Sequence, residues 1–306
     1  MAQVLEVSNL TKRFGDILAV DDLSFSVAPG EIFGFLGGNG AGKTTTLRMV
    51  LDIIRPTAGT ISVLGSSPQD RDTAAIGFLP EERGLYSHMS AIETIVYFGR
   101  LKQMDPGEAR REGMALLERF DLGERAKSKI GDMSKGMAQK VQLACSLVNR
   151  PELLMLDEPF SGLDPVNQGL LEEEILRASQ RGAAVIFSTH VMQHAERLCD
   201  RLLLLKKGGK RFEGTLAEAR AQLPTRISLV AQPEIGTVPG IEHAHVAEEL
   251  GDGWSLYEID LAPGTTSESV LETCTRKAIP LRRFEVQQAS LHEVFVQLVG
   301  EEEVQP

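Results

Sequence analysis

Short apolar runs separated by turn residues dominate the start of the chain. Val4 to Leu10 and Phe25 to Val27 have the pattern of strands, with turns at Phe14-Gly15-Asp16 and Pro29-Gly30. Further strands are predicted for Glu31 to Leu36, Thr60 to Leu64 and Ile76 to Leu79. The chain therefore begins as a β-rich region.

After Pro80 the apolar positions recur at helical spacing. Helices are predicted for Ile92 to Met104, Pro106 to Phe120 and Ser134 to Asn149. Ser90 and Ser134 are suitable N-caps, because a serine hydroxyl can accept a hydrogen bond from a free N–H of the first helical turn. We therefore expect a helical subdomain, at about residues 85–150, inserted in a larger domain.

Strands and helices alternate in the following segment. Leu153 to Leu156 and Ala183 to Thr189 read as buried strands, and Val166 to Arg181 between them reads as a helix. Strands at Asp200 to Lys206 and Lys210 to Glu213 flank a glycine turn, and a helix at Leu216 to Leu223 follows. This order predicts an α/β domain over residues 1–223, with a mixed, mainly parallel sheet.

The last part of the chain has a different pattern and charge. Strands are predicted at Arg226 to Ala231, Trp254 to Ile259 and Leu281 to Val286, with helices at Ser267 to Lys277 and Ser290 to Val299. Residues 225–306 contain 14 acidic and 5 basic residues, so they hold most of the total net charge of −11. We interpret them as a small α+β domain, although a solvated acidic face is an alternative reading of the charge.

Composition narrows the class of protein further. A chain of 306 residues with 42% hydrophobic and 25% charged residues is ordinary for a folded globular protein. No apolar run reaches the 18 or so residues that a membrane span needs, and Met-Ala-Gln-Val-Leu-Glu lacks the basic start of a signal peptide. We therefore expect a cytoplasmic protein, and the negative charge argues against one that grips nucleic acid. Cys145, Cys199 and Cys274 are too far apart to suggest a disulfide framework or a zinc cluster.

One glycine-rich stretch matches the phosphate-binding pattern G-x-x-x-x-G-K-[ST] between a predicted strand and a predicted helix. Its residues are Gly37, Gly38, Asn39, Gly40, Ala41, Gly42, Lys43, Thr44 and Thr45. The glycines let backbone N–H groups converge on phosphate oxygens, and the helix N-terminus adds partial positive charge. Lys43 supplies a charge to the outer phosphates, and Thr44 can ligate Mg²⁺. We therefore predict a nucleoside triphosphate site.

Two carboxylates and a histidine follow buried strands. Asp157 and Glu158 end the strand that begins at Leu153, and ligands of open α/β sheets bind at that edge. Asp157 can hold Mg²⁺, whereas Glu158 can accept a proton from the water that attacks the terminal phosphate. His190 follows the next buried strand and could reach the γ-phosphate or that water, although a lone histidine is more often structural.

Together these motifs resemble the ATPase subunit of an ATP-binding cassette (ABC) transporter, over roughly Val4 to Leu223. Gly37 to Thr45 is similar to the Walker A loop, and Leu153 to Glu158 to the Walker B strand with its catalytic glutamate. Further matches are Ser161-Gly162-Leu163-Asp164 for the loop across the dimer interface, Ser188-Thr189-His190 for the switch histidine, and Phe14 for the aromatic residue against adenine. The resemblance implies a P-loop ABC ATPase fold that binds ATP and Mg²⁺. Without it, Phe14 would read as core packing.

The family signature, usually Leu-Ser-Gly-Gly-Gln, corresponds here to Met133-Ser134-Lys135-Gly136-Met137. The resemblance implies that Ser134 and Gly136 bind the γ-phosphate held by a second subunit. Lys135 departs from the pattern but adds positive charge beside the phosphate. Glu81 stands where the family has a glutamine that touches Mg²⁺, and a carboxylate is also a good ligand for that ion.

The resemblance also implies partners. The expected protein dimerises around two nucleotides, with itself or with a paired ABC subunit, and drives an integral-membrane permease from the inner face of the membrane. Its docking surface would lie near Glu81 and Leu85 to Phe98. The tail, especially Ser290 to Phe295, resembles the accessory domain of bacterial export-type cassettes. The alternatives are a soluble ABC protein acting on ribosomes or nucleic acid, a GTPase-like P-loop protein, and a module that binds nucleotide without hydrolysing it.

Overall fold

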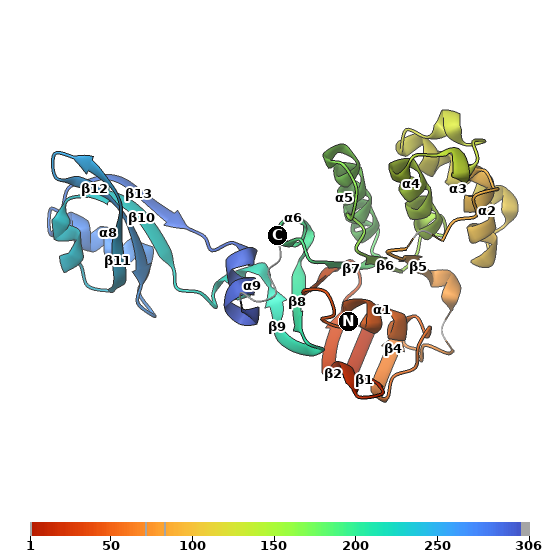
Figure 1. Ribbon diagram of the computed structural model, residues 1–306, viewed down its shortest axis with the longest axis horizontal. Coiled ribbons are helices and arrows are strands. Elements are labelled where there is room, and N and C mark those ends of the chain that lie inside the picture. The colour runs from red at the N-terminus through yellow and green to blue at the C-terminus, as the bar shows by residue number, and fades with distance from the viewer. Residues whose placement is uncertain (1, 71, 83, 301–306) are drawn as a thin grey trace. The chain divides into compact units, whose positions relative to one another are not determined.

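The computed structural model describes residues 2–300 apart from residues 71 and 83, and it separates into two compact units (Figure 1). The first unit comprises residues 2–215 and the second residues 216–300. The sequence placed this boundary at Leu223, because α7 (Leu216–Arg220) reads as the end of the first domain. The helix instead packs against α9 (Leu291–Val299), and Arg220 Nε donates to the Ala289 carbonyl at 3.0 Å, so α7 belongs to the second unit.

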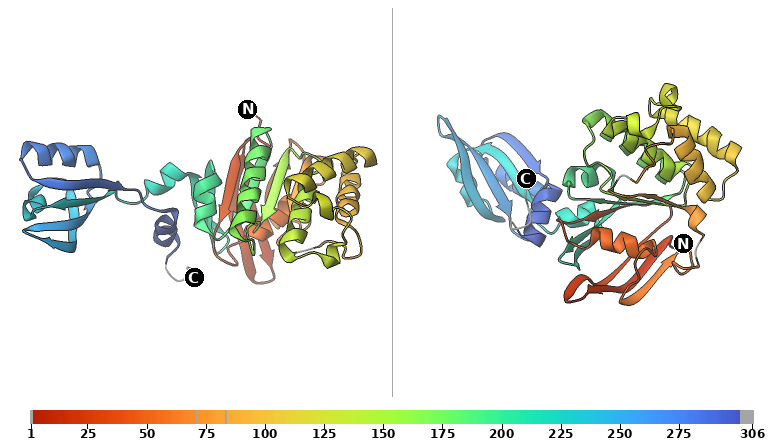
Figure 2. Two further views of the ribbon diagram at one scale, coloured as in Figure 1. Left: turned by 90° about the horizontal axis from the view of Figure 1, so that it is seen from above. Right: turned by 45° about the vertical axis from the view of Figure 1, so that its right-hand side comes forward.

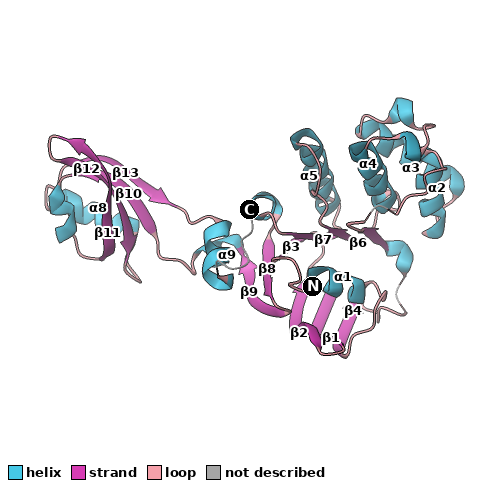
Figure 3. Ribbon diagram, viewed as in Figure 1, coloured by secondary structure: helices cyan, strands magenta, loops and turns pink. Residues whose placement is uncertain are grey.

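A six-stranded sheet forms the centre of the first unit (Figure 3). Its strands, in spatial order, are β5 (Ile76–Leu79), β6 (Leu153–Asp157), β7 (Ala184–Thr189), β3 (Ile32–Leu36), β8 (Arg201–Lys206) and β9 (Gly209–Thr215). All neighbours are parallel except β8 and β9, which form an antiparallel hairpin. The sequence therefore predicted a mixed, mainly parallel sheet correctly.

A three-stranded antiparallel sheet covers one side of this centre. It consists of β2 (Ile17–Val27), β1 (Leu5–Phe14) and β4 (Ala58–Val63) in that order. Helix α1 (Lys43–Val50) lies between the two sheets (Figure 2), where Leu47 shares one buried cluster with Val7 of β1 and Phe35 of β3. The sequence predicted only the last three residues of β2, because its first half alternates less clearly between apolar and polar positions.

Helices cover the other face of the central sheet. They are α2 (Ala91–Leu101), α3 (Pro106–Arg119), α4 (Lys135–Leu147), α5 (Pro165–Gln180) and α6 (Met192–Leu198). Alternate residues of the central strands, such as Leu154 and Phe187, share a buried cluster with these helices. Ser90 begins α2 with a capping box to Glu93, and the Ser134 hydroxyl accepts from the Met137 N–H at the start of α4. Both predicted N-caps are thus confirmed.

The second unit is built on a four-stranded antiparallel sheet. The strands, in spatial order, are β11 (Ile241–Gly251), β12 (Trp254–Leu261), β10 (Arg226–Ala231) and β13 (Leu281–Gln287). Helix α8 (Ser267–Arg276) supplies Val270 and Cys274 to a core that includes Leu229 and Ile259. The edge strand β11 is exposed from its second residue to its last, and three register irregularities interrupt its pairing with β12. This strand was not predicted from the sequence.

The described part of the chain contains no helix with the length and apolar character needed to cross a membrane. All three cysteines are free. Burial raises the pKa of the Cys145 and Cys199 thiols well above the ordinary range, so both are protonated at neutral pH. They act as small core residues.

Gly77 of β5 allows α4 to pack closely on the sheet, and this generates a prediction for stability. A Cβ atom at Gly77 would lie 2.2 Å from the Ser146 carbonyl oxygen of α4. We expect Gly77→Ala to lower the free energy of unfolding by about 1–3 kcal/mol, because the helix must move away. Urea denaturation followed by circular dichroism measures this loss.

Gly169→Ala is the matched control, since a Cβ at Gly169 in α5 meets no atom within 4 Å. Replacing a glycine in a helix by alanine stabilises that helix by about 0.5–1 kcal/mol. Equal loss of stability in the two variants would contradict the close approach at Gly77.

Candidate active site

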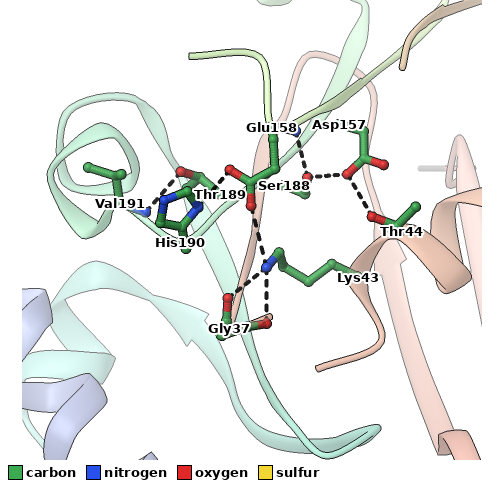
Figure 4. A network of polar contacts seen from close by, with 10 residues as sticks. Gly37, Lys43, Thr44, Asp157, Glu158, Ser188, Thr189, His190 and Val191 are labelled. Carbon is green, nitrogen blue, oxygen red and sulfur yellow. Dashed lines mark hydrogen bonds and ion pairs between the residues drawn. The ribbon is translucent and has the colours of Figure 1, made fainter. Parts of the chain in front are cut away.

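The parallel register of three central strands sets the position of the site. Leu36 of β3 pairs with Thr189 of β7, and Asp157 of β6 pairs with Ser188 of β7. The three strands therefore end at one edge of the sheet, and the segments that leave them meet there (Figure 4). This is the edge at which the sequence predicted ligand binding.

The loop from Gly37 to Thr45 joins β3 to α1 and forms an anion-binding turn. Gly42 occupies the N-cap of α1 with a φ of 103°, and a Cβ there would lie 2.7 Å from the Ala19 carbonyl oxygen. Only glycine fits this position without strain. No side chain caps the helix, so its first N–H groups remain available to phosphate oxygens. The buried Lys43 extends back across the loop, where its Nζ donates to the carbonyls of Gly37 at 2.7 Å and Gly38 at 3.3 Å.

The Glu158 carboxylate lies between two basic groups (Figure 4). Its Oε1 is 3.4 Å from Lys43 Nζ, and its Oε2 is 2.9 Å from His190 Nδ1. The Glu158 side chain is 11% exposed but that of His190 is 56% exposed, so the histidine has freedom to move that the glutamate lacks. Glu158 also has a left-handed backbone with a φ of 46°, which costs a non-glycine residue about 1–2 kcal/mol. Such strain persists where the surrounding structure fixes a functional side chain.

Asp157 is held by two hydroxyl groups at the same edge. Its Oδ1 accepts from Ser188 Oγ at 2.6 Å and from Thr44 Oγ1 at 3.1 Å, and the side chain is almost fully buried. Ser188 Oγ in turn accepts from the backbone N–H of Glu158 at 2.9 Å. One serine therefore positions both carboxylate residues. The sequence patterns predicted no separate role for Ser188, although a polar residue within a buried strand was the available signal.

A cavity of about 720 Å³ opens over this edge. The predicted residues that line it are Phe14, Gly38, Asn39, Gly40, Ala41, Gly42, Lys43, Thr44, Thr45, Glu81, Glu158 and His190. Gly37 and Asp157 lie behind the lining and contact Lys43 and Thr44. Ile17, Leu18, Ala19, Ser161 and Lys207 also line the cavity. The sequence motifs did not predict these five residues as part of the nucleotide site.

Lys207 reaches the cavity from the turn between β8 and β9. Lys207 and Gly208 have φ values of 49° and 82°, a pair of positive angles at which Asn-Gly or Asp-Gly is preferred. The Gly208 N–H donates to the Ala41 carbonyl at 3.1 Å, which ties the turn to the phosphate-binding loop. In the sequence, Lys207 stands where an asparagine or aspartate is usual in such a turn. This departure was the signal that could have identified Lys207 as a functional residue.

Ser134 and Gly136 lie elsewhere, at the start of α4, and do not line the cavity. Lys135 is the first residue of that helix. Their predicted action on a nucleotide held by a second subunit stays a prediction.

Comparison with known proteins adds a family to this geometry. Residues 20–161 match the ABC transporter family, and residues 214–299 match the C-terminal domain of DrrA1-3-like ATP-binding proteins. An uncharacterized ABC transporter ATP-binding protein of Bacillus subtilis, YhaQ, is 38% identical over 97% of this chain and 99% of its own. The Nod factor export ATP-binding protein I of Burkholderia orbicola is 36% identical over 97% of each chain. A dimeric ATP-binding cassette, MJ0796, solved in a post-hydrolysis state with ADP and phosphate, has 25% identity and a TM-score of 0.62 over 69% of this chain and 98% of its own.

The position of Ser188 generates a second prediction. Ser188→Ala should lower the free energy of unfolding by about 1–3 kcal/mol, because the buried Asp157 carboxylate and the Glu158 N–H each lose a hydrogen-bond partner. Urea denaturation measures the loss. Ser8→Ala, at an exposed position of β1, serves as the control and should stay within about 0.5 kcal/mol of the wild type. Equal stabilities of the two variants would show that Ser188 does not hold the carboxylates.

Proposed function

The chain belongs to the ABC transporter family, in which it is an ATP-binding and ATP-hydrolysing subunit, and we propose that it powers export through a separate membrane permease. The observation that carries the proposal is the Glu158 carboxylate, which lies between Lys43 and His190 beside the phosphate-binding loop. This arrangement provides a base, a cation and a mobile polar group in one cavity. These are the groups that phosphoryl transfer to water requires.

Each side chain of the site then has a role toward ATP. The N–H groups of the loop and Lys43 bind the phosphates, and Lys43 exchanges its contact with Glu158 for one with a phosphate oxygen. Glu158 accepts a proton from the attacking water, a contribution of about 10²–10⁴ to the rate. His190 orients that water and the γ-phosphate. Phe14, which is 47% exposed at the cavity, stacks on the base.

The donor set beside the loop fits Mg²⁺. Thr44 Oγ1 and Asp157 Oδ1 are oxygen ligands that lie 3.1 Å apart, and Glu81 lines the same cavity. We assign Thr44 and Asp157 as the residues that hold the ion, with Glu81 as a further ligand. When bound, the ion neutralises charge on the phosphates.

A second subunit completes the site in this proposal. The start of α4 presents Ser134, Gly136 and the positive charge of Lys135, all outside the cavity of their own subunit. We assign these residues to the γ-phosphate bound by the partner. ATP then favours the closed dimer because it contacts both subunits, and hydrolysis removes that preference. The dimeric form of the related cassette supports this arrangement.

An apolar groove supports docking of a permease on the first unit. It has a volume of about 440 Å³ and is lined by the segment after α1, by β5, by Leu85, and by residues of α2 and α4. Ile53 and Leu101, which line it, are 59% and 57% exposed, and exposed apolar side chains that gather on one patch mark interaction sites. The groove includes Leu85 and Phe98, the ends of the surface that the sequence predicted. We assign it to a cytoplasmic segment of the permease, which places the protein on the inner face of the membrane.

The direction of transport is assigned from the relatives. The name of the Burkholderia relative specifies export, and that protein is similar to this chain over nearly its whole length. Residues 214–299 also match the C-terminal domain of DrrA1-3-like ATP-binding proteins. We therefore propose an exporter, with homodimeric or paired cassettes and no direct contact with nucleic acid.

The assignment of Glu158 predicts a specific loss of turnover. Glu158→Gln should lower the steady-state rate of ATP hydrolysis by about 10²–10⁴, because the amide cannot accept the proton, while ATP affinity is retained. Lys43→Ala should instead weaken ATP binding itself. Phosphate release and equilibrium nucleotide titration measure the two effects. Unchanged turnover in Glu158→Gln would remove Glu158 from the mechanism.

A charge introduced into the groove should weaken the association of the protein with its permease. Leu101→Glu places a charge on the groove and should weaken association at least tenfold, since a buried leucine contributes about 1.5–3 kcal/mol. Leu176→Glu, at an exposed position of α5 outside the groove, should leave association unchanged. Co-purification from detergent-solubilised membranes of the natural host measures both. Retention of the membrane protein by Leu101→Glu would contradict docking in the groove.

A further inference from the structure

A buried histidine that hydrolysis does not use lies next to the active site. His194 of α6 is 7% exposed, and its ring stacks on Phe160 with 3.9 Å between centroids and 9° between planes. Phe160 is 5% exposed and meets the Phe187 ring of β7 edge to face at 5.8 Å. Two flat rings in parallel contact restrict each other's position more than aliphatic side chains would. The two rings therefore hold each other in a fixed position within the core, and we call the stack of His194 on Phe160 the joint.

The joint connects the two segments that carry Glu158 and His190. Phe160 follows Glu158 by two residues, and His194 follows His190 by four. The Glu158 and His190 side chains meet at 2.9 Å, so each segment contacts the other at two places. A displacement of one segment then moves both contacts together. The left-handed backbone of Glu158 needs such support, because an isolated residue would leave that conformation.

Glu172 of α5 lies beside the joint and contacts His194. Its side chain is buried, its Oε2 accepts from Arg197 at 2.5 Å, and its Oε1 lies 3.5 Å from His194 Nδ1. Neither Glu172 Oε1 nor His194 Nδ1 has a hydrogen-bond partner among the described residues, so the two atoms lie close together without forming a hydrogen bond. Helix α5 begins directly after Asp164, the end of the loop assigned to the dimer interface. The joint thus reaches three segments of the site.

We propose that His194 is a positioning residue for ATP hydrolysis, which through its stack on Phe160 fixes Glu158 and His190 relative to each other. The proposal rests on the proposed function, and it adds a residue that touches neither nucleotide nor water. Lys43 and Thr44 are not part of the joint, so it acts on the rate of hydrolysis and not on nucleotide binding. Burial lowers the pKa of His194, and the positive charge of Arg197 lowers it slightly further. The carboxylates of Glu172 and Glu158 oppose this effect, because they favour the protonated imidazole. The imidazole is therefore neutral at neutral pH.

The test compares the rate and the affinity of four full-length variants. His194→Ala and Phe160→Leu should lower kcat about tenfold or more with KM for ATP unchanged, since a small misplacement of a reacting group is enough for such a loss. His194→Phe keeps a flat ring on Phe160 and should restore most of the rate. Phe25→Leu is the matched control, because Phe25 of β2 has similar burial but lies in the other core cluster, where its ring meets those of Phe33 and Phe35. It should lower stability and leave kcat unchanged.

A pH series gives a readout of the imidazole itself. The folded protein binds a proton at His194 less readily than the unfolded chain, whose histidine has a pKa of about 6.5. The free energy of unfolding should therefore fall as the pH is lowered through that value. His194→Phe should remove this part of the pH dependence. Persistence of the whole dependence in His194→Phe would contradict a buried neutral imidazole.

Two results would overturn the proposal. One is a kcat of His194→Ala equal to that of the Phe25→Leu control, and the other is failure of His194→Phe to recover activity while it binds ATP normally. The Glu158→Gln variant distinguishes an error in the role of His194 from an error in the proposed function. If Glu158→Gln loses turnover and His194→Ala does not, only the role of His194 is wrong. If Glu158→Gln keeps full turnover, the hydrolytic site itself is wrong.

Discussion

The parallel pairing of β6, β7 and β3 is the constraint on which the site depends. Backbone hydrogen bonds fix Phe35, Asp157 and Ser188 at the same level of the sheet, although they are far apart in the chain. The sheet is buried on both faces, since alternate residues of each strand belong to two different clusters. A slip of one strand by one residue would exchange the side chains that face the two core clusters, and it would separate the carboxylates from the phosphate-binding loop. Packing of the core and geometry of the site are thus specified together.

Much of the site could be predicted from the sequence because its signals are local. The loop pattern around Lys43 and the strand that ends at Asp157 and Glu158 need only neighbouring residues to be recognised. The contact between Thr44 and Asp157 spans 113 residues, and the sheet topology alone brings the two together. The stack of His194 on Phe160 is of the same kind, because neither residue has a pattern that names its partner.

The fold was predictable where burial produces a clear pattern. Strands buried on both faces are continuous apolar runs, and this identified β3, β6 and β7. Helix α6 has only seven residues and no side-chain cap, so neither its periodicity nor its start could be recognised. Strand β11 is exposed on both sides and therefore lacks alternation. The boundary between the units was placed too late because α7 packs on α9, a contact across about 70 residues of chain that no local signal reveals.

The acidic residues of the second unit include several on its exposed edge strand, β11, where they can oppose pairing with other molecules. A strand as long as β11 at the edge of a sheet has unpaired N–H and C=O groups on its outer side. These groups can pair with strands of other molecules, which is a common route to aggregation. Glu242, Glu248 and Glu249 lie along that strand, and its register irregularities disturb the regular ladder that an added strand would need. Two such edges brought together would align like charges on poorly matched backbones. The acidic side chains and the irregular register of β11 thus disfavour pairing between the open sheet edges of two C-terminal units.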